Sequence, residues 1–449
     1  MTDTDELAAF AARTRLADLP DDVITAAKIV MLDGLANAVA GSREPVAQFV
    51  ANYIVPLGGQ ADATVVSRRE RIPAAQAALV NGVALHCLDY EVQGYPSAHG
   101  TSSILPAIAA VAERDGNSGG DVIAAFVVGW DVQQRLRAAG ENGDMRGFHP
   151  PGIVGPVAAA AAVANLRRMD IDHIRMALGL SASRTGGLFG NNGTMTKATH
   201  PGNAARSGVE SADLAELGVT SNPDIMGDHR GYGRATVGGP LDSEILLDGL
   251  GTRFHLTDPG YTIKPFPAEI YMQWPLDAMT ELRRRTGVRL DDVVDIIVEP
   301  PAFRADLSRP APATGLDGKF SYEYVVAAAL VEPRVRISTF TDDVRFGPEM
   351  VRALTLVRLV DNPDIPQDKA KTWSRVTVRT RDGQVHEQVS TAFEGTPGRP
   401  MSRNAHAEKI SDCFEEGGAA GVLDEVLERM ERLERLPKFD QVMRLLAAN

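Results

Sequence analysis

The sequence predicts a mainly α-helical protein with a smaller α+β second domain. Ala-rich segments with helical periodicity dominate the first 250 residues, and β-branched, partly alternating segments begin after about residue 265. The 449 residues also exceed what one typical hydrophobic core holds. We therefore expect a large all-helical domain over 1–265 and a smaller α+β lid domain over 266–399. The tail 400–449 is helical again and is expected to return to the first domain.

The helices of the first domain follow from apolar spacing. Asp21 and Asp22 precede apolar residues three and four positions apart, and Gly41 ends that pattern. A second helix begins at Pro73, because proline is favoured in the first turn. The same pattern returns in the Ala-rich segments 105–116, 119–136 and 152–166. Small residues on nearly every face indicate helices that pack closely on several sides.

The second domain mixes strands with helices. The segments 293–299, 354–360 and 374–393 are rich in β-branched residues. Asp382–Gly383 is a strong signal for a hairpin that divides the last of them into two strands. Helical stretches are predicted at 274–286 and 321–331. The turn-rich segment 394–402 then leads to the helical tail.

Composition excludes several classes of protein. The chain has 46 basic and 59 acidic residues, a net charge of −13, which argues against nucleic acid as a partner. Cys87 and Cys413 are its cysteines, too few for a disulfide framework or a multi-cysteine metal site. We read no signal peptide and no apolar run of about 18 residues. A cytoplasmic protein without membrane association is therefore expected.

Polar residues interrupt the apolar helices at five places. The first is 85–107, which places His86, Asp89, Gln93 and His99 between two apolar segments. The other four carry the remaining candidates, namely His149, Lys197 with His200 and Arg206, Lys264, and Tyr324. Each residue alone could be a helix cap or a solvated side chain. Together they place ionisable groups beside Gly and Pro at helix ends, which favours a functional site.

These residue types suit proton transfer next to a carboxylate. Lysines can stabilise the charge that develops there, and His or Tyr can move the proton. We find no phosphate-binding loop, no dinucleotide fingerprint and no nucleophile elbow. His86, Asp89 and His99 could together bind the metal of a hydrolase, but an HExxH motif is missing. We predict no metal and treat His86 as structural, because it falls within the preceding helix.

Seven segments extend this pattern over nearly the whole chain. They are LDGLANAVAGS (32–42), PAAQAALVNGVALHCLDYE (73–91), SAHGTSSILPAIAAVAE (97–113), FHPPGIVGPVAAAAAV (148–163), TKATHPGNAARSGVESADLAELG (196–218), IKPFPAEIYMQWPLDA (263–278) and KFSYEYVVAAAL (319–330). In this order they resemble the MmgE/PrpD family, which includes 2-methylcitrate dehydratases, cis-aconitate decarboxylases and iminodisuccinate epimerases. The resemblance implies a large helical domain with an α+β lid, a homodimer, and neither cofactor nor metal.

The resemblance also assigns roles by position. It implies catalytic roles for Asp89, His99, His149 and Tyr324. It implies substrate-binding roles for Lys197 and Lys264, and we add Gln93, His200 and Arg206 from the same polar segments. Gln93 departs from the small hydroxyl residue common at its position in the decarboxylases, which implies a narrower or differently lined pocket.

We therefore predict a cofactor-independent lyase acting on a small di- or tricarboxylate, with dehydration of a 2-methylcitrate-like acid as the first reading. Decarboxylation and epimerisation are alternatives, because all three reactions exchange a proton at a carbon next to a carboxylate. A catalytically silent scaffold for binding or dimerisation is the alternative from another class. We expect His99 to transfer the proton, with Asp89 beside it favouring the imidazolium form.

Overall fold

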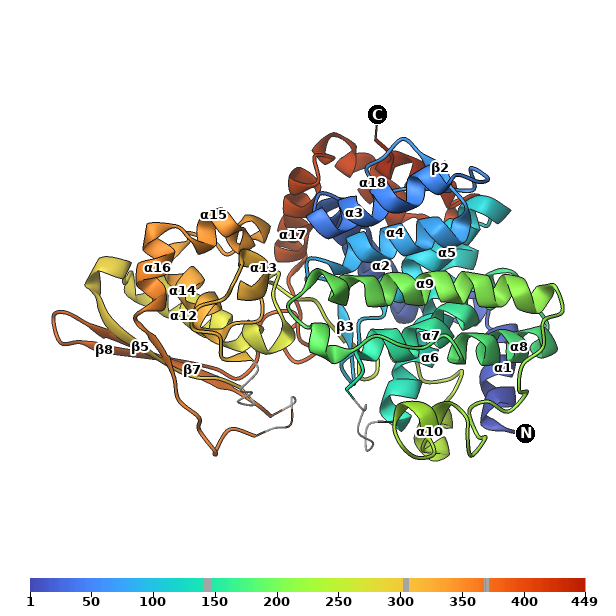
Figure 1. Ribbon diagram of the computed structural model, residues 1–449, viewed down its shortest axis with the longest axis horizontal. Helices are drawn as coiled ribbons and strands as arrows, with labels where there is room; N and C mark the ends of the chain where they lie inside the picture. Colours follow the sequence, from blue (N-terminus) through green and yellow to red (C-terminus); the bar gives the residue numbers. More distant parts are fainter. Residues whose placement is uncertain (141–146, 302–306, 367, 369–370, 449) are drawn as a thin grey trace.

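The computed structural model describes residues 1–140, 147–301, 307–366, 368 and 371–448. Two parts lie side by side, a larger helical one and a smaller one that carries a β-sheet (Figure 1). The prediction of a mainly helical protein with a smaller α+β part is confirmed.

The helical part is built from most of the chain before residue 264 and from the C-terminal tail. Short β-pairs join Ala63–Thr64 (β1) to Arg71–Ile72 (β2), and Gln93–Gly94 (β3) to Tyr261–Thr262 (β4). The α-helices are α1 (Asp3–Arg13), α2 (Asp21–Gly41), α3 (Pro45–Ile54), α4 (Ala74–His86), α5 (Thr101–Asp115), α6 (Gly119–Ala139), α7 (Pro150–Leu166), α8 (Ile171–Ala182), α9 (Met195–Glu216), α10 (Tyr232–Thr236), α11 (Ser243–Leu247), α17 (Arg403–Glu416), α18 (Leu423–Glu431) and α19 (Asp440–Met443).

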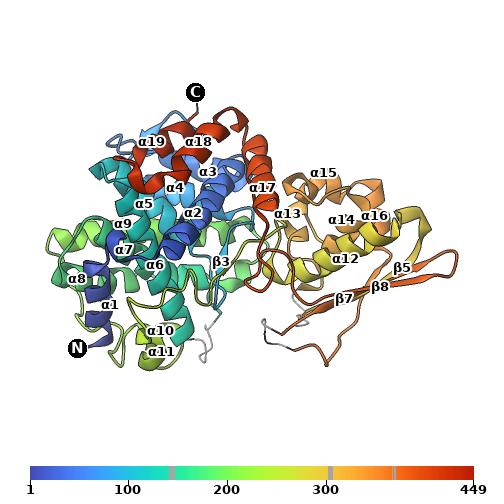
Figure 2. The same ribbon diagram turned by 180° about the vertical axis from the view of Figure 1, so that it is seen from behind.

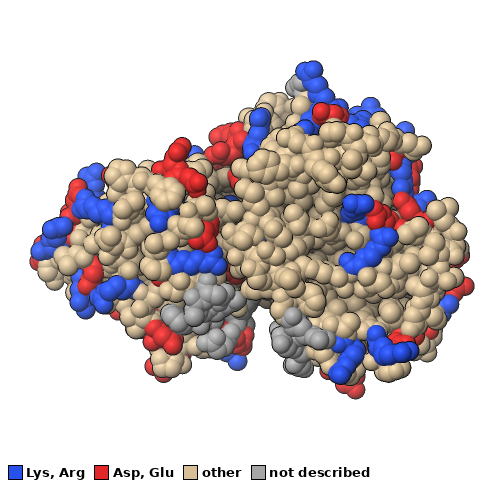
Figure 3. All heavy atoms as spheres, in the orientation of Figure 1, with Lys and Arg blue, Asp and Glu red and all other residues tan. Residues whose placement is uncertain are grey.

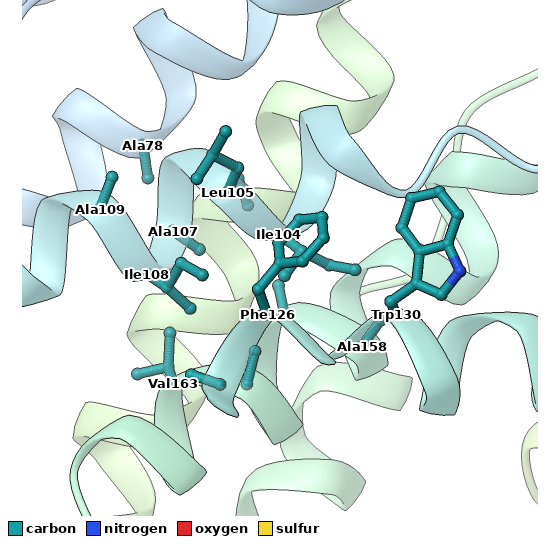
Figure 4. Close-up of a cluster of buried hydrophobic side chains, with 14 of the residues drawn as sticks. Ala78, Ile104, Leu105, Ala107, Ile108, Ala109, Phe126, Trp130, Ala158 and Val163 are labelled. Carbon is teal, nitrogen blue, oxygen red and sulfur yellow. The ribbon is translucent and has the colours of Figure 1, made fainter. Parts of the chain in front are cut away.

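Small residues let these helices approach closely, as their composition predicts. A Cβ added to Gly82 of α4 would lie 2.8 Å from the Cα of Gly202 in α9. A Cβ on Gly208 of α9 would lie 2.4 Å from the Cβ of Ala159 in α7. Larger apolar side chains, such as Ile104, Phe126 and Trp130, fill the core between α4, α5, α6 and α7 (Figure 4). The close packing fixes the ends of α4, α7 and α9, where the candidate residues lie.

The small part holds a four-stranded sheet in the order β6-β5-β7-β8. Strand β5 is parallel to β6 and antiparallel to β7, and β7 forms a hairpin with β8. Gly383 has a φ of +85° in the hairpin turn, as the Asp-Gly signal predicts. The helices and strands of the small part are α12 (Gln273–Thr286), β5 (Val293–Glu299), α13 (Gly315–Gly318), α14 (Tyr322–Val331), α15 (Asp342–Arg345), α16 (Pro348–Leu354), β6 (Val357–Leu359), β7 (Ser374–Thr380) and β8 (Val385–Ser390).

Each of the two parts has its own large apolar core. One cluster gathers buried residues from Leu7 to Ile263 together with Ile410 to Leu446, and the other runs from Ala268 to Val378. Helix α17 lies where the two parts meet (Figures 1 and 2). There its Asp412 pairs with Arg334 of the small part at 2.8 Å. The division of the cores supports the proposed domain boundaries at 265 and 399, which remain a prediction.

Helix α2 is long and apolar enough to cross a membrane by length and composition, contrary to our reading of the sequence. Within the described residues it is the one helix that passes this test. Of its most apolar window, 72% is buried inside the fold. Core helices of globular proteins commonly have these properties.

Candidate active site

The turn that follows α4 is the centre of the candidate site. Helix α4 ends at His86, and Asp89 closes the turn by donating its backbone N–H to the carbonyl of His86 at 2.9 Å. Asp89 has a φ of +52°, a left-handed conformation that aspartate tolerates better than most residues. The whole stretch from His86 to Gly94 is buried. The sequence therefore carries its polar residues into the protein interior rather than into a solvated linker.

Two lysines hold the carboxylate of Asp89. Lys264 Nζ lies 2.5 Å from Oδ1, and Lys197 Nζ contacts Oδ2. The pairing of β3 with β4 sets Gln93 opposite Thr262, which brings the segment after β4, and with it Lys264, to the turn. Lys197 comes from α9, which begins at Met195, so it lies in the first turn of that helix. Helical backbone there aims Lys197 inward.

Charge around Asp89 is unevenly balanced. Burial alone would raise the pKa of this carboxyl, but Lys197 and Lys264 outweigh that effect and hold it well below its usual range. Burial lowers the pKa of Lys264, and the contact with Asp89 offsets part of this. One carboxylate thus faces two ammonium groups. The cluster of Asp89, Lys197 and Lys264 is therefore able to bind a further anion.

His99 lies beside this ion pair and is oriented by a second carboxylate. Its Nε2 is 3.7 Å from Oδ1 of Asp89, while its Nδ1 is 3.3 Å from Oε1 of Glu91. Glu91 also accepts hydrogen bonds from the backbone N–H of Ser102 at 2.9 Å and from its hydroxyl at 2.7 Å. Both side chains are buried. Glu91, more than Asp89, sets the orientation of this imidazole.

His99 is neutral near pH 7, contrary to our expectation of an imidazolium. Burial lowers the pKa of His99 to about 4, although Glu91 acts in the opposite direction. Nearby His86 and Lys264 lower it further. The expectation failed because removal from water outweighs one neighbouring carboxylate. A neutral imidazole in this position can accept a proton.

Gln93 contacts the other side of the His99 ring. Its amide nitrogen lies 2.8 Å from Nε2 of His99, and its Oε1 accepts a hydrogen bond from Ser97 Oγ at 2.5 Å. Because the amide N–H donates to Nε2, the ring proton is assigned to Nδ1, on the side of Glu91. Gln93 therefore occupies the lone pair of Nε2, and the Gln93 amide must release it before His99 can accept a proton from a substrate.

Two histidines, His86 and His149, lie beside His99, and a third, His200, lies against His149. The ring centroid of His86 lies 4.7 Å from that of His99, and its Nδ1 is 2.6 Å from Glu91 Oε1. His149 immediately precedes α7 and lies 5.6 Å from His86, centroid to centroid. His200 of α9 contacts His149, Nδ1 to Nδ1, at 3.2 Å. Burial lowers the pKa values of His86, His149 and His200. We expected His86 to be structural, but its ring is part of the histidine cluster itself.

Two candidates lie apart from this group. The hydroxyl of Tyr324 donates to the carbonyl of Thr339 at 2.6 Å, and its ring packs against Phe340 in the small part. Arg206 lies on the outer side of α9, where it pairs with Glu210 at 2.7 Å. Within the part of the chain that the structure describes, neither side chain contacts Asp89, Lys197 or Lys264. Their predicted roles in catalysis and substrate binding find no support in these contacts.

A small cavity of about 30 Å³ lies where the two parts meet. His86, Asp89 and Lys197 line it from the helical part, and Leu316 and Phe320 line it from the small part. Lys197 Nζ also lies 4.8 Å from the ring centroid of Phe320. This volume suffices for a water molecule, whereas ligand pockets are typically about 300 Å³ or larger. The site is closed in this conformation.

Among the described residues, His86, Glu91 and His99 form a group that could bind a metal. Their ligand atoms lie within 4.8 Å of one another, and all three are buried. Asp89, which we considered as a third ligand, is held by the two lysines instead. Oε1 of Glu91 already accepts from Ser102, and Lys264 lowers the pKa of both histidines electrostatically. A dication would compete with these interactions, so the donor set fits a metal poorly.

Sequence reasoning missed Glu91 and two lysines, Lys319 and Lys409. Glu91 follows Tyr90 in a polar stretch, where a glutamate usually reads as solvated. Its signal was the spacing, five residues after His86 and eight before His99. Lys319 directly precedes Phe320, and its ammonium group donates to the carbonyl of Leu88 at 2.9 Å. Nothing local marks either lysine as buried.

Comparison with known proteins gives two family matches. The MmgE/PrpD N-terminal domain matches residues 5–244, and the MmgE/PrpD C-terminal domain matches residues 266–434. The chain is 28% identical to the cis-aconitate decarboxylase of Mus musculus, over 99% of this chain and 93% of that protein. It is 29% identical to that of Homo sapiens, over 88% and 84%. It is 26% identical to that of Aspergillus terreus, over 90% and 88%.

Proposed function

The chain belongs to the MmgE/PrpD family, and from that premise we propose that it is a cofactor-independent lyase of a small di- or tricarboxylate. The predicted class of lyase agrees with the family and with the names of the relatives. The observation that carries the proposal is the contact of Lys197 and Lys264 with Asp89 beside the neutral His99.

The lysines suit a substrate that carries several negative charges. Substrate carboxylates can accept hydrogen bonds from the ammonium groups of Lys197 and Lys264 while both still contact Asp89. In a buried site such charge-assisted bonds are stronger than in water. They also stabilise the electron pair that develops on a carbon next to a carboxylate.

Decarboxylation of an acid like cis-aconitate is the first candidate reaction. The bond between carbon and the departing carboxylate breaks, carbon dioxide leaves, and the electron pair that remains is protonated on carbon. His99 would supply that proton, because an anionic substrate raises the pKa of a neighbouring imidazole. The names of the relatives support this candidate.

Dehydration is the second candidate, and a separate observation favours it. The pKa of His99 is lowered to about 4, so its Nε2 is unprotonated at neutral pH and can accept a proton once the Gln93 amide moves away from it. His99 would take a proton from a carbon next to a carboxylate and return it to the departing hydroxide, which leaves as water while a conjugated double bond forms. Epimerisation would begin with the same proton removal and return the proton on the other face.

Substrate entry requires the two parts to separate. The cavity of about 30 Å³ is too small for a six-carbon acid, and Leu316 and Phe320 of the small part close it. We infer that the small part moves away as a lid and closes again over the bound acid. Closure would exclude water from the proton-transfer step.

One experiment separates the candidates. The protein is incubated with cis-aconitate, citrate, 2-methylcitrate and malate while ultraviolet absorbance and carbon dioxide release are recorded. Carbon dioxide release identifies a decarboxylase, and a rise in absorbance without it identifies a dehydratase. Lys264→Met should reduce kcat/KM more than about 30-fold, because a lost charge-assisted contact costs about 2–5 kcal/mol. Lys371→Met, at an exposed position, is the control. A folded protein inert toward the whole panel would contradict the proposal.

A homodimer is part of the proposal. Phe49 and Tyr53 of α3 are 63% and 70% exposed, and Leu57 beyond them is 58% exposed. A broad area of the helical part carries no charged side chains on the face shown in Figure 3. Exposed apolar surface of this kind is typical of protein interfaces. Light scattering of the purified protein measures the oligomeric state.

The cytoplasmic location remains a prediction.

A further inference from the structure

Three consecutive backbone carbonyls in the Asp89 turn are bound by lysines. Residues 88–90 lie between α4 and β3, so no helix or sheet supplies them with regular hydrogen bonds. Each carbonyl accepts from a different buried ammonium group: Leu88 from Lys319 at 2.9 Å, Asp89 from Lys264 at 2.9 Å and Tyr90 from Lys409 at 2.8 Å.

These lysines replace the missing backbone partners. Among the described residues, none of the three carbonyls accepts a backbone N–H. Leaving a buried carbonyl without a donor is costly, and a charged donor makes the stronger bond. Because an ammonium group binds from outside the local chain, the shape of this turn depends on where distant segments place their lysines.

The three donors come from three different regions. Lys264 follows β4, Lys319 lies in the small part just before α14, and Lys409 lies in the C-terminal helix α17. All three are buried. The turn that carries Asp89 is therefore tied at once to the helical part, to the small part and to the C-terminal tail.

Lys409 is itself fixed on two sides. Its ammonium group lies 2.8 Å from Oδ2 of Asp33 in α2 and 4.0 Å from the ring centroid of Tyr90. The amide of Asn37 donates to Oδ1 of Asp33 at 2.9 Å. The hydroxyl of Tyr90 donates to the carbonyl of Pro265, next to Lys264, at 3.1 Å. These bonds leave Lys409 little freedom to point elsewhere.

We propose that Lys319 and Lys409 are positioning residues, which hold the Asp89 turn in the shape that presents its carboxylate to Lys197 and Lys264. Lys319 belongs to the small part, so its hydrogen bond to Leu88 forms only when the small part is closed against the helical part. The shape of the turn therefore depends on that closed position. The inference rests on the proposed function for its effect on turnover. Its effect on the turn itself can be measured without any substrate.

The test is hydrogen–deuterium exchange, read by mass spectrometry, of the amides in residues 87–94. Lys319→Met and Lys409→Met each keep side-chain length and remove the donor. Lys28→Met is the matched control, because Lys28 also joins α2 to the C-terminal tail, at Glu434 (2.8 Å), but does not contact the turn. Since Lys409→Met leaves Asp33 without its lysine, Asp33→Asn with Lys409→Met is the second variant, which keeps that site neutral.

Exchange in residues 87–94 should rise at least tenfold in the Lys319 and Lys409 variants and stay at the wild-type rate in Lys28→Met. On a substrate that the wild type turns over, kcat should fall about 10- to 100-fold, as expected for misplaced catalytic groups, with a smaller change in KM. Wild-type exchange in both Lys319→Met and the double variant would overturn the proposal. Raised exchange in a protein inert toward every acid would instead support the positioning role and contradict the proposed activity.

Discussion

The ammonium group of Lys264 contacts Asp89 twice, at the carboxylate Oδ1 (2.5 Å) and at the backbone carbonyl (2.9 Å). One lysine thereby fixes both the side chain and the backbone of a residue with a φ of +52°. Lys197 completes the arrangement at Oδ2. The two contacts of Lys264 with Asp89 thus link the conformation of the strained turn after α4 to the charge of the candidate site.

Asp89→Asn should destabilise the protein by about 3–5 kcal/mol, because it leaves two buried ammonium groups without a carboxylate. Asparagine tolerates the left-handed backbone at this position, so loss of charge is the main change. Urea unfolding measures the difference. Asp368→Asn, at an exposed surface pair with Lys371, is the control and should change stability by less than about 1 kcal/mol. Equal effects of both substitutions would contradict a buried, charged Asp89.

His99→Gln should lower kcat about 100-fold or more, the usual contribution of a general acid or base. His86→Gln should act mainly on stability, because it removes the buried contact between His86 Nδ1 and Glu91 Oε1 at 2.6 Å. Steady-state kinetics and thermal unfolding of both variants separate the two effects. Loss of turnover in His86→Gln with normal turnover in His99→Gln would reverse the assignment.

Stability should fall as the pH is lowered from about 6.5 to about 4. The folded protein lowers the pKa of His99 to about 4 from 6.5, so in this window the unfolded chain binds more protons. His99 alone accounts for up to about 3 kcal/mol at the lower end. Urea unfolding across this range measures the slope, which His99→Gln should reduce. An unchanged slope in His99→Gln would show that His99 is not buried in the neutral form.

Removal of metal should leave activity unchanged. His86, Glu91 and His99 are the described residues closest to a metal-binding arrangement, yet Ser102 already donates to Glu91 Oε1 at 2.7 Å. The protein is treated with a chelator, assayed, and analysed for bound metal by mass spectrometry. One equivalent of bound metal, with activity that disappears on chelation and returns on its addition, would contradict this account.

Local pattern was enough to predict much of the fold. The spacing of apolar residues predicted helix 274–286 and strand 293–299 to within one residue of α12 and β5. The segment 354–360 was read as a strand, but α16 ends at Leu354 and β6 spans only Val357–Leu359. Helix α9 has less local signal, because Pro201 lies inside it and the close approach of Gly202 to α4 is a feature of the tertiary structure.

The candidate site was predictable where ionisable residues interrupt apolar sequence. This signal found Asp89, His99, Lys197 and Lys264, which the fold brings together. It could not find Lys409, because a lysine in an amphipathic C-terminal helix looks solvated until α17 packs against α2. It also could not give the ionisation of His99, because burial is a property of the tertiary structure rather than of its neighbours in the chain.

We expect His99 to exchange a proton with a substrate carbon next to a carboxylate. The most direct measurement is turnover of cis-aconitate in deuterium oxide, followed by proton magnetic resonance and mass spectrometry of the product. We predict one deuterium on carbon for each turnover by the wild type, and at least about a 100-fold slower incorporation by His99→Gln. Turnover without deuterium on carbon, or incorporation at the wild-type rate in His99→Gln, would contradict the claim.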